Sequence, residues 1–252
     1  MKSCGLVSIS FRQHTVDEII DAVKEAGLKY IEWGSDVHVP EGDVETAKAV
    51  KVKMDASGLK TSSYGSYYKL GQNQNIVPFL ESAKVLDTDI IRIWAGGKGS
   101  AETDEETRKA WTTEAKEVCK KAAEYGIKID FEYHPNTLTD CRDSAYRLLQ
   151  EINEPNCGIY WQPFYKLSQE ENLKEAEKVM PYVDVLHLFY WENHSVRRFL
   201  KDAKEELTAY IKAFSGRAVV KLLEFVPDND IGYLQGEAQT LFEILKEAEE
   251  YK

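Results

Sequence analysis

Four residues with metal-binding chemistry lie at the ends of apolar segments in the second half of the sequence: Glu132, Gln162, His187 and Glu224. A bare carboxylate in an apolar segment is costly, so each glutamate is expected to be paired, protonated or bound to a cation. Two carboxylate oxygens, one imidazole nitrogen and one amide oxygen suit a divalent ion such as Mn²⁺ and leave positions for substrate oxygens. If the fold brings these residues together, they predict a metal site.

Each of these residues also has a structural interpretation. The two glutamates could form ion pairs with Arg92 or Lys221 instead of binding a metal. His187 could be a hydrogen-bonded histidine of the core, and Gln162, which precedes a proline, could cap a loop. The fold decides between these interpretations.

Short β-branched or aromatic segments alternate with longer amphipathic helical segments along the chain. This alternation is typical of βαβ units with a parallel sheet. Gly27, Gly58 and Gly126 each separate a helical segment from the next strand, which indicates one repeated unit. The expected strands are Gly5–Ser10, Tyr30–Trp33, Lys60–Tyr64, Ile90–Trp94, Lys128–Tyr133, Gly158–Trp161, Val185–Phe189 and Val219–Phe225.

The regular spacing of these segments favours one domain over residues 1–252, because no linker rich in Gly, Ser or Pro interrupts it. Eight such units with right-handed crossovers close into a (β/α)8 TIM barrel. The competing architecture is an open doubly wound sheet. The segment from Ser10 to His14 lacks the glycine-rich phosphate turn of that fold.

Other polar and aromatic residues at the expected strand ends are candidates for substrate contacts, since a barrel of this kind places its chemistry there. Glu32 and His38 could equally belong to exposed edges or ion pairs. The aromatic residues could line the pocket or pack the core. The candidates for substrate contacts are Glu32, His38, Tyr64, Arg92, His134 and Trp161.

Composition excludes several other classes of protein. The 252 residues are 43% hydrophobic and 30% charged, with 32 basic against 43 acidic residues and a net charge of −11. A negative surface repels phosphate backbones and anionic membranes, so neither nucleic-acid binding nor membrane association is expected. Four scattered cysteines and the absence of an apolar leader favour a cytoplasmic protein with reduced thiols.

The sequence resembles the xylose isomerase-like TIM barrels, which include sugar and sugar-phosphate isomerases and the D-tagatose 3-epimerase group. The resemblance is carried by Ala26–Glu32, Phe131–His134, His187 with the following Trp191–Arg198, and Glu224 with Phe225. It implies that Glu, Asp, His and Glu on strands five to eight hold a divalent metal. Those roles fall on Glu132, Gln162, His187 and Glu224, and the glutamine is a departure that makes the ligand set one charge less negative.

The resemblance also implies an activity on small carbohydrates. Glu132 and Glu224 would move a proton next to a carbonyl, as in isomerases and epimerases, although other members use a metal-assisted hydride shift. Mn²⁺ is the expected ion, with Mg²⁺, Co²⁺ or Zn²⁺ as alternatives. Arg197 or Arg198 would contact the substrate, or both would lie on a solvated helix start.

Several alternatives to an isomerase or epimerase remain. A keto-inositol dehydratase-like lyase begins with the same proton removal, and a non-catalytic sugar-binding barrel would explain Gln162. An endonuclease IV-like nuclease is disfavoured, because its zinc cluster needs more ligands than five histidines and the available aspartates provide here. Such barrels often form oligomers, so a homo-oligomer is possible.

Overall fold

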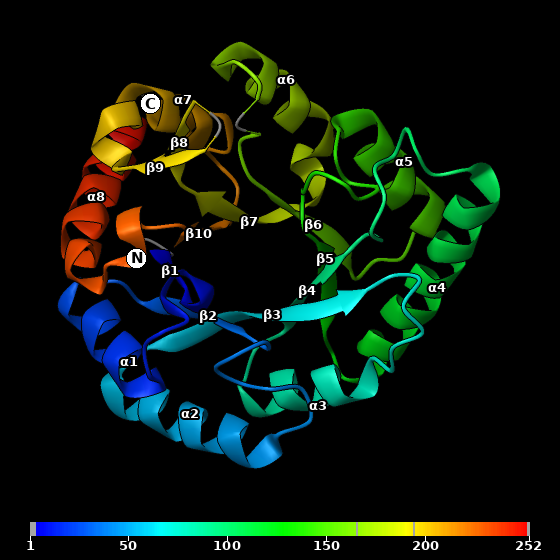
Figure 1. Ribbon diagram of the computed structural model, residues 1–252, viewed down its shortest axis with the longest axis horizontal. Coiled ribbons are helices and arrows are strands. Elements are labelled where there is room, and N and C mark those ends of the chain that lie inside the picture. The colour runs from blue at the N-terminus through cyan, green and yellow to red at the C-terminus, as the bar shows by residue number, and fades with distance from the viewer. Residues whose placement is uncertain (1–3, 165, 194, 251–252) are drawn as a thin grey trace.

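The strands expected from the sequence form a closed parallel barrel surrounded by helices (Figure 1). The computed structural model describes residues 4–164, 166–193 and 195–250. Within them, β10 pairs with β1 and closes the sheet in the order β1-β10-β7-β6-β5-β4-β3-β2. The barrel strands are β1 (Cys4–Val7), β2 (Tyr30–Gly34), β3 (Lys60–Lys69), β4 (Ile90–Trp94), β5 (Lys128–Phe131), β6 (Cys157–Trp161), β7 (Val183–Leu188) and β10 (Val220–Leu223). The prediction of a single-domain (β/α)8 TIM barrel is confirmed.

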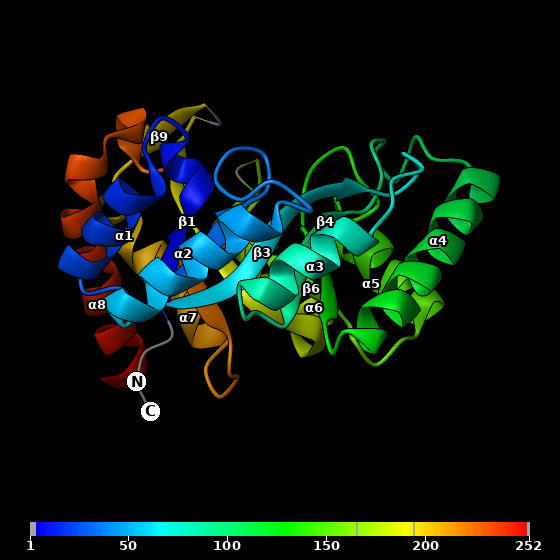
Figure 2. The ribbon, with the colours of Figure 1, turned by 90° about the horizontal axis from the view of Figure 1, so that it is seen from below.

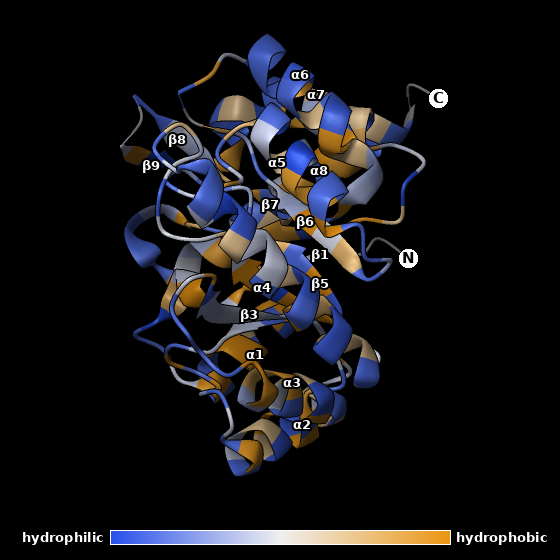
Figure 3. Ribbon diagram, turned by 90° about the vertical axis from the view of Figure 1, so that its right-hand side faces the viewer, coloured by the Kyte–Doolittle hydropathy of each residue, from blue (hydrophilic) through white to orange (hydrophobic). Residues whose placement is uncertain are grey.

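The helices lie outside the barrel between successive strands, with their polar faces outward (Figure 3). Thr15 caps the first of them and exchanges hydrogen bonds with Glu18, which fixes where that helix begins. Gly27, Gly58 and Gly126 all have positive φ, as the repeated helix-to-strand joint requires. The helices are α1 (Val16–Glu25), α2 (Val44–Ser57), α3 (Val77–Val85), α4 (Glu105–Glu124), α5 (Arg142–Ile152), α6 (Gln169–Val179), α7 (Lys204–Ala213) and α8 (Leu234–Glu250).

A small apolar layer fills the barrel interior. Val7, Tyr160, Val185 and Leu222 form a fully buried cluster separate from the main core. Because side chains alternate along a strand, Tyr160, Val185 and Leu222 share a face with the residues two positions further on, which are Gln162, His187 and Glu224. The interior therefore consists of an apolar layer with a polar layer next to it, towards the ends of the strands.

The structure also differs from the sequence prediction at some element boundaries. The first strand ends early because Ser8–Phe11 forms a 3-10 helix, η1, and β3 continues to Lys69. An antiparallel hairpin of β8 (Tyr190–Glu192) and β9 (Val196–Arg198) was not predicted, because its strands are only three residues long. It lies on the same side of the barrel as the loops that follow the strands (Figure 2), and residue 194 in it is outside the described part. No helix among the described residues has the length and apolarity needed to cross a membrane.

A buried carboxylate holds the last helix against the segment that follows the hairpin. Both oxygens of Glu237, on α8, lie near the backbone nitrogen of Leu200, at 3.3 and 3.1 Å. Leu200 begins the 3-10 helix η3 (Leu200–Ala203). Burial raises the pKa of Glu237 to about 7, although the hydrogen bond from Leu200 acts in the opposite direction.

This raised pKa predicts a pH-dependent stability. The stabilisation linked to protonated Glu237 is fully present below its unfolded pKa of 4.5 and is lost as the pH rises through about 7. We expect Glu237→Gln to be about as stable as the wild type near pH 4 and about 1–3 kcal/mol more stable near pH 8, discounted for partial exposure. Urea unfolding across this range measures the effect.

The exposed Glu81→Gln is the control for this measurement, and it should unfold like the wild type. Stability curves of Glu237→Gln and the wild type that run parallel over the whole pH range would contradict the assignment.

Candidate functional site

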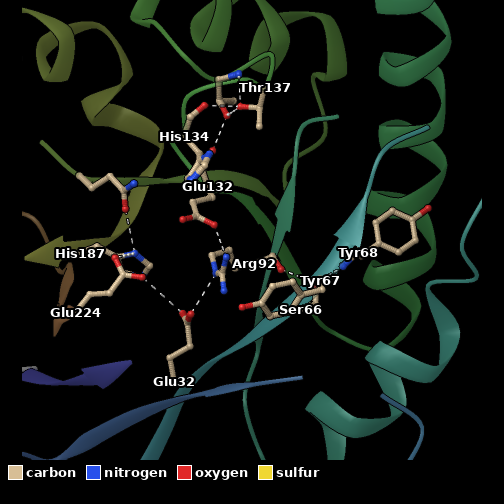
Figure 4. Close-up of polar contacts among 12 residues, drawn as sticks. Glu32, Ser66, Tyr67, Tyr68, Arg92, Glu132, His134, Thr137, His187 and Glu224 are labelled. Atoms are coloured by element: carbon tan, nitrogen blue, oxygen red, sulfur yellow. Dashed lines mark hydrogen bonds and ion pairs between the residues drawn. The ribbon is translucent and has the colours of Figure 1, made fainter. Parts of the chain in front are cut away.

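The four predicted metal ligands come together at one end of the barrel (Figure 4). Glu132, His187 and Glu224 are buried, and one ligand atom from each lies within 4.8 Å of the others. The Nδ1 atom of His187 lies 3.2 Å from the Gln162 Oε1 atom and 3.3 Å from the Glu224 Oε2 atom. The structure thus supplies three oxygen donors and one imidazole nitrogen facing a common region.

The order of strands in the barrel explains this convergence. The ligands lie on or directly after β5, β6, β7 and β10, which are consecutive in the closed sheet. The backbone N–H of Glu132 donates to Ile93 at 3.0 Å, and that of Glu224 donates to Leu188 at 3.1 Å. These bonds hold the glutamates against the neighbouring strands although both lie just past the end of their own.

An arginine inside the barrel links two of the glutamates. The Arg92 Nε atom lies 3.1 Å from the Glu32 Oε1 atom, and its Nη1 atom donates to Glu132. Arg92 is only 2% exposed. The expected ion pair between Glu132 and Arg92 is therefore present, whereas the Lys221 ammonium donates to the Val219 carbonyl at 2.8 Å.

The cluster carries more negative than positive charge. Glu32, Glu132 and Glu224 are all buried, and a single guanidinium lies among them. Burial alone would raise the pKa of Glu32, but Arg92 and His187 lower it to about 2. Burial alone would lower the pKa of His187, but Glu224 and Glu32 raise it to about 10. The glutamates of the cluster thus stabilise positive charge on the neighbouring imidazole.

These observations are consistent with a divalent cation. The Glu224 Oε2 atom accepts no hydrogen bond from the described residues although it is buried. A buried carboxylate oxygen of this kind is costly unless a cation or donor satisfies it. The donor set of Glu132, Gln162, His187 and Glu224 fits such an ion.

A pocket lies next to the cluster and gives it access to small molecules. Its empty volume is about 520 Å³, and Glu132 and Gln162 form part of its lining. Aromatic and apolar side chains supply most of the rest, with two polar groups among them. The other lining residues are Tyr133, His134, Pro135, Asp140, Pro163, Phe164, Phe189, Trp191 and Phe225.

The His134 ring is held by a hydrogen bond from its Nδ1 atom and by stacking on a tryptophan. Its Nδ1 atom lies 2.7 Å from the Pro135 carbonyl oxygen. A carbonyl oxygen only accepts, so Nδ1 carries the hydrogen, and in the neutral ring Nε2 keeps its lone pair. The ring stacks on Trp94, with centroids 4.7 Å apart and 27° between the planes. Its hydrogen bond and its stacking thus hold the His134 ring in one orientation at the pocket.

The family model of the xylose isomerase-like TIM barrel matches residues 20–215 of the chain. The chain belongs to this family. The membership agrees with the resemblance seen in the sequence, and the match covers strands β2 to β9 as well as the helices between them.

One relative and one solved structure similar to this chain carry the name of a 3-dehydroshikimate dehydratase. The chain is 27% identical over 166 residues to a 3-dehydroshikimate dehydratase of Bacillus anthracis, and the match covers 62% of this chain and 59% of that relative. The crystal structure of the probable 3-DHS dehydratase AsbF from Bacillus anthracis has a TM-score of 0.83, with 20% identity over 96% of this chain and 99% of that one.

Metal binding and epimerase activity also occur among similar structures. The IolI protein, solved with a bound zinc atom, has a TM-score of 0.75 and 16% identity, covering 98% of each chain. L-ribulose 3-epimerase has a TM-score of 0.75 at 11% identity, covering 100% of this chain and 97% of that one. At these identities the likeness shows the shared barrel.

Within this barrel, Tyr64 and His38 lie away from the pocket and have structural contacts. The Tyr64 hydroxyl donates to the Val39 carbonyl at 2.7 Å, and the ring is fully buried. The His38 ring nitrogens lie 3.1 Å from the Ser8 hydroxyl and 3.2 Å from the His14 carbonyl. Tyr64 thus ties β3 to the loop after β2, and His38 ties that loop to the segment after β1.

Trp161 and Glu32 are likewise not brought to the pocket. Trp161 points outward and packs against Tyr210 and Phe214 of the α7 region, with centroid distances of 5.3 Å. Glu32 is fully buried at the base of the cluster, next to Arg92. Its contacts are with other site residues and leave it out of reach of a pocket-bound substrate.

The two hairpin arginines differ in position. Arg197 lies over the Phe225 ring, 4.7 Å from its centroid, and donates to Asn229, so it packs on a wall of the pocket. Arg198 is exposed and pairs with Glu192 at 2.7 Å. Neither arginine is among the lining residues of the pocket, and Arg197 contacts one of them, Phe225.

Two pocket residues could not be recognised from the sequence as site residues. Asp140 lines the pocket from the loop after β5, and nothing in its sequence context indicates this. Phe225 has a φ of 55°, which is rare for an aromatic residue, and the resulting turn presents its ring to the pocket. A strained non-glycine residue directly after Glu224 is a structural sign of a functional site.

We expect Mn²⁺ to stabilise the protein by binding this cluster. At about 100 times the Kd, a bound ion adds about 2.7 kcal/mol, or roughly 5–10 °C in Tm for a chain of this size. Glu224→Gln removes the unsatisfied carboxylate and should abolish most of this shift, as thermal unfolding with and without chelator will show.

The control is Glu192→Gln, which removes a half-exposed hairpin carboxylate and should leave the Mn²⁺ shift intact. A wild-type Tm that does not respond to Mn²⁺, or an undiminished shift in Glu224→Gln, would rule out this cluster as the binding site.

Proposed function

We propose that this chain is a metal-dependent lyase that dehydrates a small hydroxylated ring ketone of the 3-dehydroshikimate type. The observation that carries the proposal is His134, a proton acceptor of fixed orientation that lies beside Glu132 in an aromatic pocket. The 27% identity over 166 residues to a 3-dehydroshikimate dehydratase supports this choice of substrate class.

Glu132, Gln162, His187 and Glu224 would hold the metal. Three oxygen donors and one imidazole favour Mn²⁺, with Mg²⁺ as the second choice. When bound, the ion stabilises the negative charge that develops on the substrate carbonyl oxygen. The Arg92 guanidinium binds one oxygen of Glu132 and restricts the carboxylate to one orientation.

His134 would act as the base and then as the acid. Its Nε2 atom takes a proton from the carbon next to the carbonyl, and the electrons of that C–H bond move towards the carbonyl. The Nδ1–H bond to Pro135 stabilises the imidazolium that forms. As the carbonyl re-forms and a new C=C bond appears, the neighbouring hydroxyl leaves and takes the proton from Nε2 as water. One histidine thus completes the cycle unchanged.

The pocket wall suits a ring better than an open polyol. Phe189, Trp191 and Phe225 pack edge to face with centroid distances of 5.3 to 6.1 Å. Their faces offer apolar contact to a flat ring, while polar groups of the pocket lie nearer the metal ligands. An acyclic sugar would leave more of its hydroxyls without partners against this wall.

A sugar epimerase or isomerase is the second candidate, supported by the placement of Glu132 and Glu224. Their ligand atoms lie within 4.8 Å of each other and of His187, and they belong to strand ends separated by β6 and β7. One glutamate would take a proton from the carbon next to the carbonyl and the other would return it. Among similar structures, L-ribulose 3-epimerase supports this alternative.

A direct assay separates the two candidates. Protein loaded with Mn²⁺ is given 3-dehydroshikimate, and formation of an aromatic catechol product is followed by absorbance; a panel of ketoses is tested in parallel by chromatography. We expect the aromatic product. Epimerised ketoses without it would favour the second candidate, and no product from either would favour a non-catalytic barrel.

His134→Asn tests the proposed base. Asparagine keeps a donor for the Pro135 carbonyl but has no proton acceptor of imidazole basicity, so kcat should fall by about 10²–10⁴-fold. Metal binding should be retained, which the Mn²⁺-induced shift in Tm measures. His14→Asn, a change in a histidine outside the pocket lining, is the matched control. Wild-type kcat in His134→Asn would reject the role.

A further inference from the structure

Glu32 occupies the base of the polar cluster and has no access to solvent. Its Oε1 atom lies 3.1 Å from the Arg92 Nε atom. Its Oε2 atom accepts from the Ser63 hydroxyl at 2.8 Å and lies 4.0 Å from the His187 Nε2 atom. This carboxylate is therefore shared between two charged groups of the site.

These contacts connect Glu32 to every predicted metal ligand (Figure 4). On one side, the guanidinium that it binds donates onward to Glu132. On the other side, the His187 ring has Nε2 towards Glu32 and Nδ1 towards Gln162 and Glu224. Glu32 thus lies next to one predicted ligand, His187, and is linked through Arg92 to another, Glu132.

We propose that Glu32 is a positioning residue for the metal site, an inference that rests on the metal-dependent function proposed above. It holds the His187 ring with Nδ1 towards the ligand oxygens. It also aims the Arg92 guanidinium at one oxygen of Glu132, which leaves the other oxygen for the ion.

The geometry of an imidazole explains why such a residue is needed. A half-turn of the ring would place a C–H group where Nδ1 now lies, and a carboxylate at Nε2 makes that orientation unfavourable. The Tyr160 ring packs against the His187 ring, with centroids 5.1 Å apart and 84° between the planes. This contact limits the space for the imidazole but does not distinguish its nitrogens from its carbons. Glu32 at Nε2 therefore favours the same ring orientation as the Gln162 and Glu224 oxygens at Nδ1.

The backbone is built around this carboxylate. A Cβ atom at Gly65 would lie 2.6 Å from the Glu32 Oε1 atom and 2.8 Å from the Arg92 Nη2 atom. A side chain at position 65 would displace the pair. Glycine at this position preserves the space that the Glu32–Arg92 contact requires.

The test uses Glu32→Gln in the full chain with Mn²⁺ alone as the probe. Glutamine keeps the size of the side chain but removes its charge, so we expect the Kd for Mn²⁺ to rise about 10–100-fold. Isothermal titration calorimetry measures the Kd. Glu237→Gln, at a buried glutamate on α8 that accepts from the Leu200 backbone and makes no hydrogen bond to a candidate ligand among the described residues, is the matched control and should leave the Kd unchanged.

A second readout needs no metal. Nitrogen NMR of the His187 ring in chelator-treated protein, at one fixed pH, reports which ring nitrogen carries a proton and whether the ring has one orientation. We expect one defined state in the wild type and in Glu237→Gln, and a changed or averaged signal in Glu32→Gln. A merely structural ion pair with Arg92 would not move this signal.

The outcomes separate this inference from the proposed function. An unchanged Kd and unchanged ring signals in folded Glu32→Gln overturn the positioning role. A wild type that binds no Mn²⁺ removes the metal-dependent function, and the ring signals then still decide on Glu32. If Glu32→Gln does not fold, Ser63→Ala removes only the hydroxyl at Oε2. A weaker Kd or altered ring signals in that variant support the role, and wild-type values for both overturn it.

Discussion

The site depends on holding three carboxylates together inside a barrel with a single guanidinium among them. Glu32, Glu132 and Glu224 are each no more than 5% exposed, and Arg92 contacts two of them directly. Repulsion between such groups is strong where water is excluded, so the arrangement persists only because a closed sheet fixes every strand end. The apolar layer around Tyr160 keeps water away from the side of the cluster that faces the barrel interior. The same constraint that makes the cluster costly makes it attractive to a cation.

The two glutamates of the ligand set differ in their surroundings. Glu132 is bound by Arg92 and lines the pocket, whereas the Glu224 Oε2 atom lies 3.3 Å from the His187 Nδ1 atom and accepts no hydrogen bond from the described residues. A carboxylate bound by a guanidinium is a weaker proton acceptor than a free one. This asymmetry argues against treating the pair as interchangeable proton carriers and directs attention to His134.

The sequence predicted the barrel and the convergence of the four candidate ligands because both depend on order along the chain. Strand periodicity and repeated glycine joints define eight units, and Glu132, Gln162, His187 and Glu224 interrupt four consecutive strands. The directions of Tyr64 and Trp161 depend instead on the phase of each strand. If Gln162 faces inward, its neighbour Trp161 faces outward. The outward direction of Trp161 could therefore have been predicted from the alternation. Nothing local could indicate Asp140 or the hairpin, since loops and three-residue strands carry no periodic signal.

The departure at Gln162 follows from the same charge balance. An aspartate there would add a fourth carboxylate to a region where Arg92 and the His187 imidazole already face three, and the metal-free protein would bear the added repulsion. The amide removes that charge, and its oxygen still faces His187 Nδ1 at 3.2 Å. At the proposed metal site, glutamine would favour stability of the metal-free barrel over affinity for the ion. That affinity would then depend more heavily on how well the imidazole and the two glutamates are oriented, which is the role that we propose for Glu32.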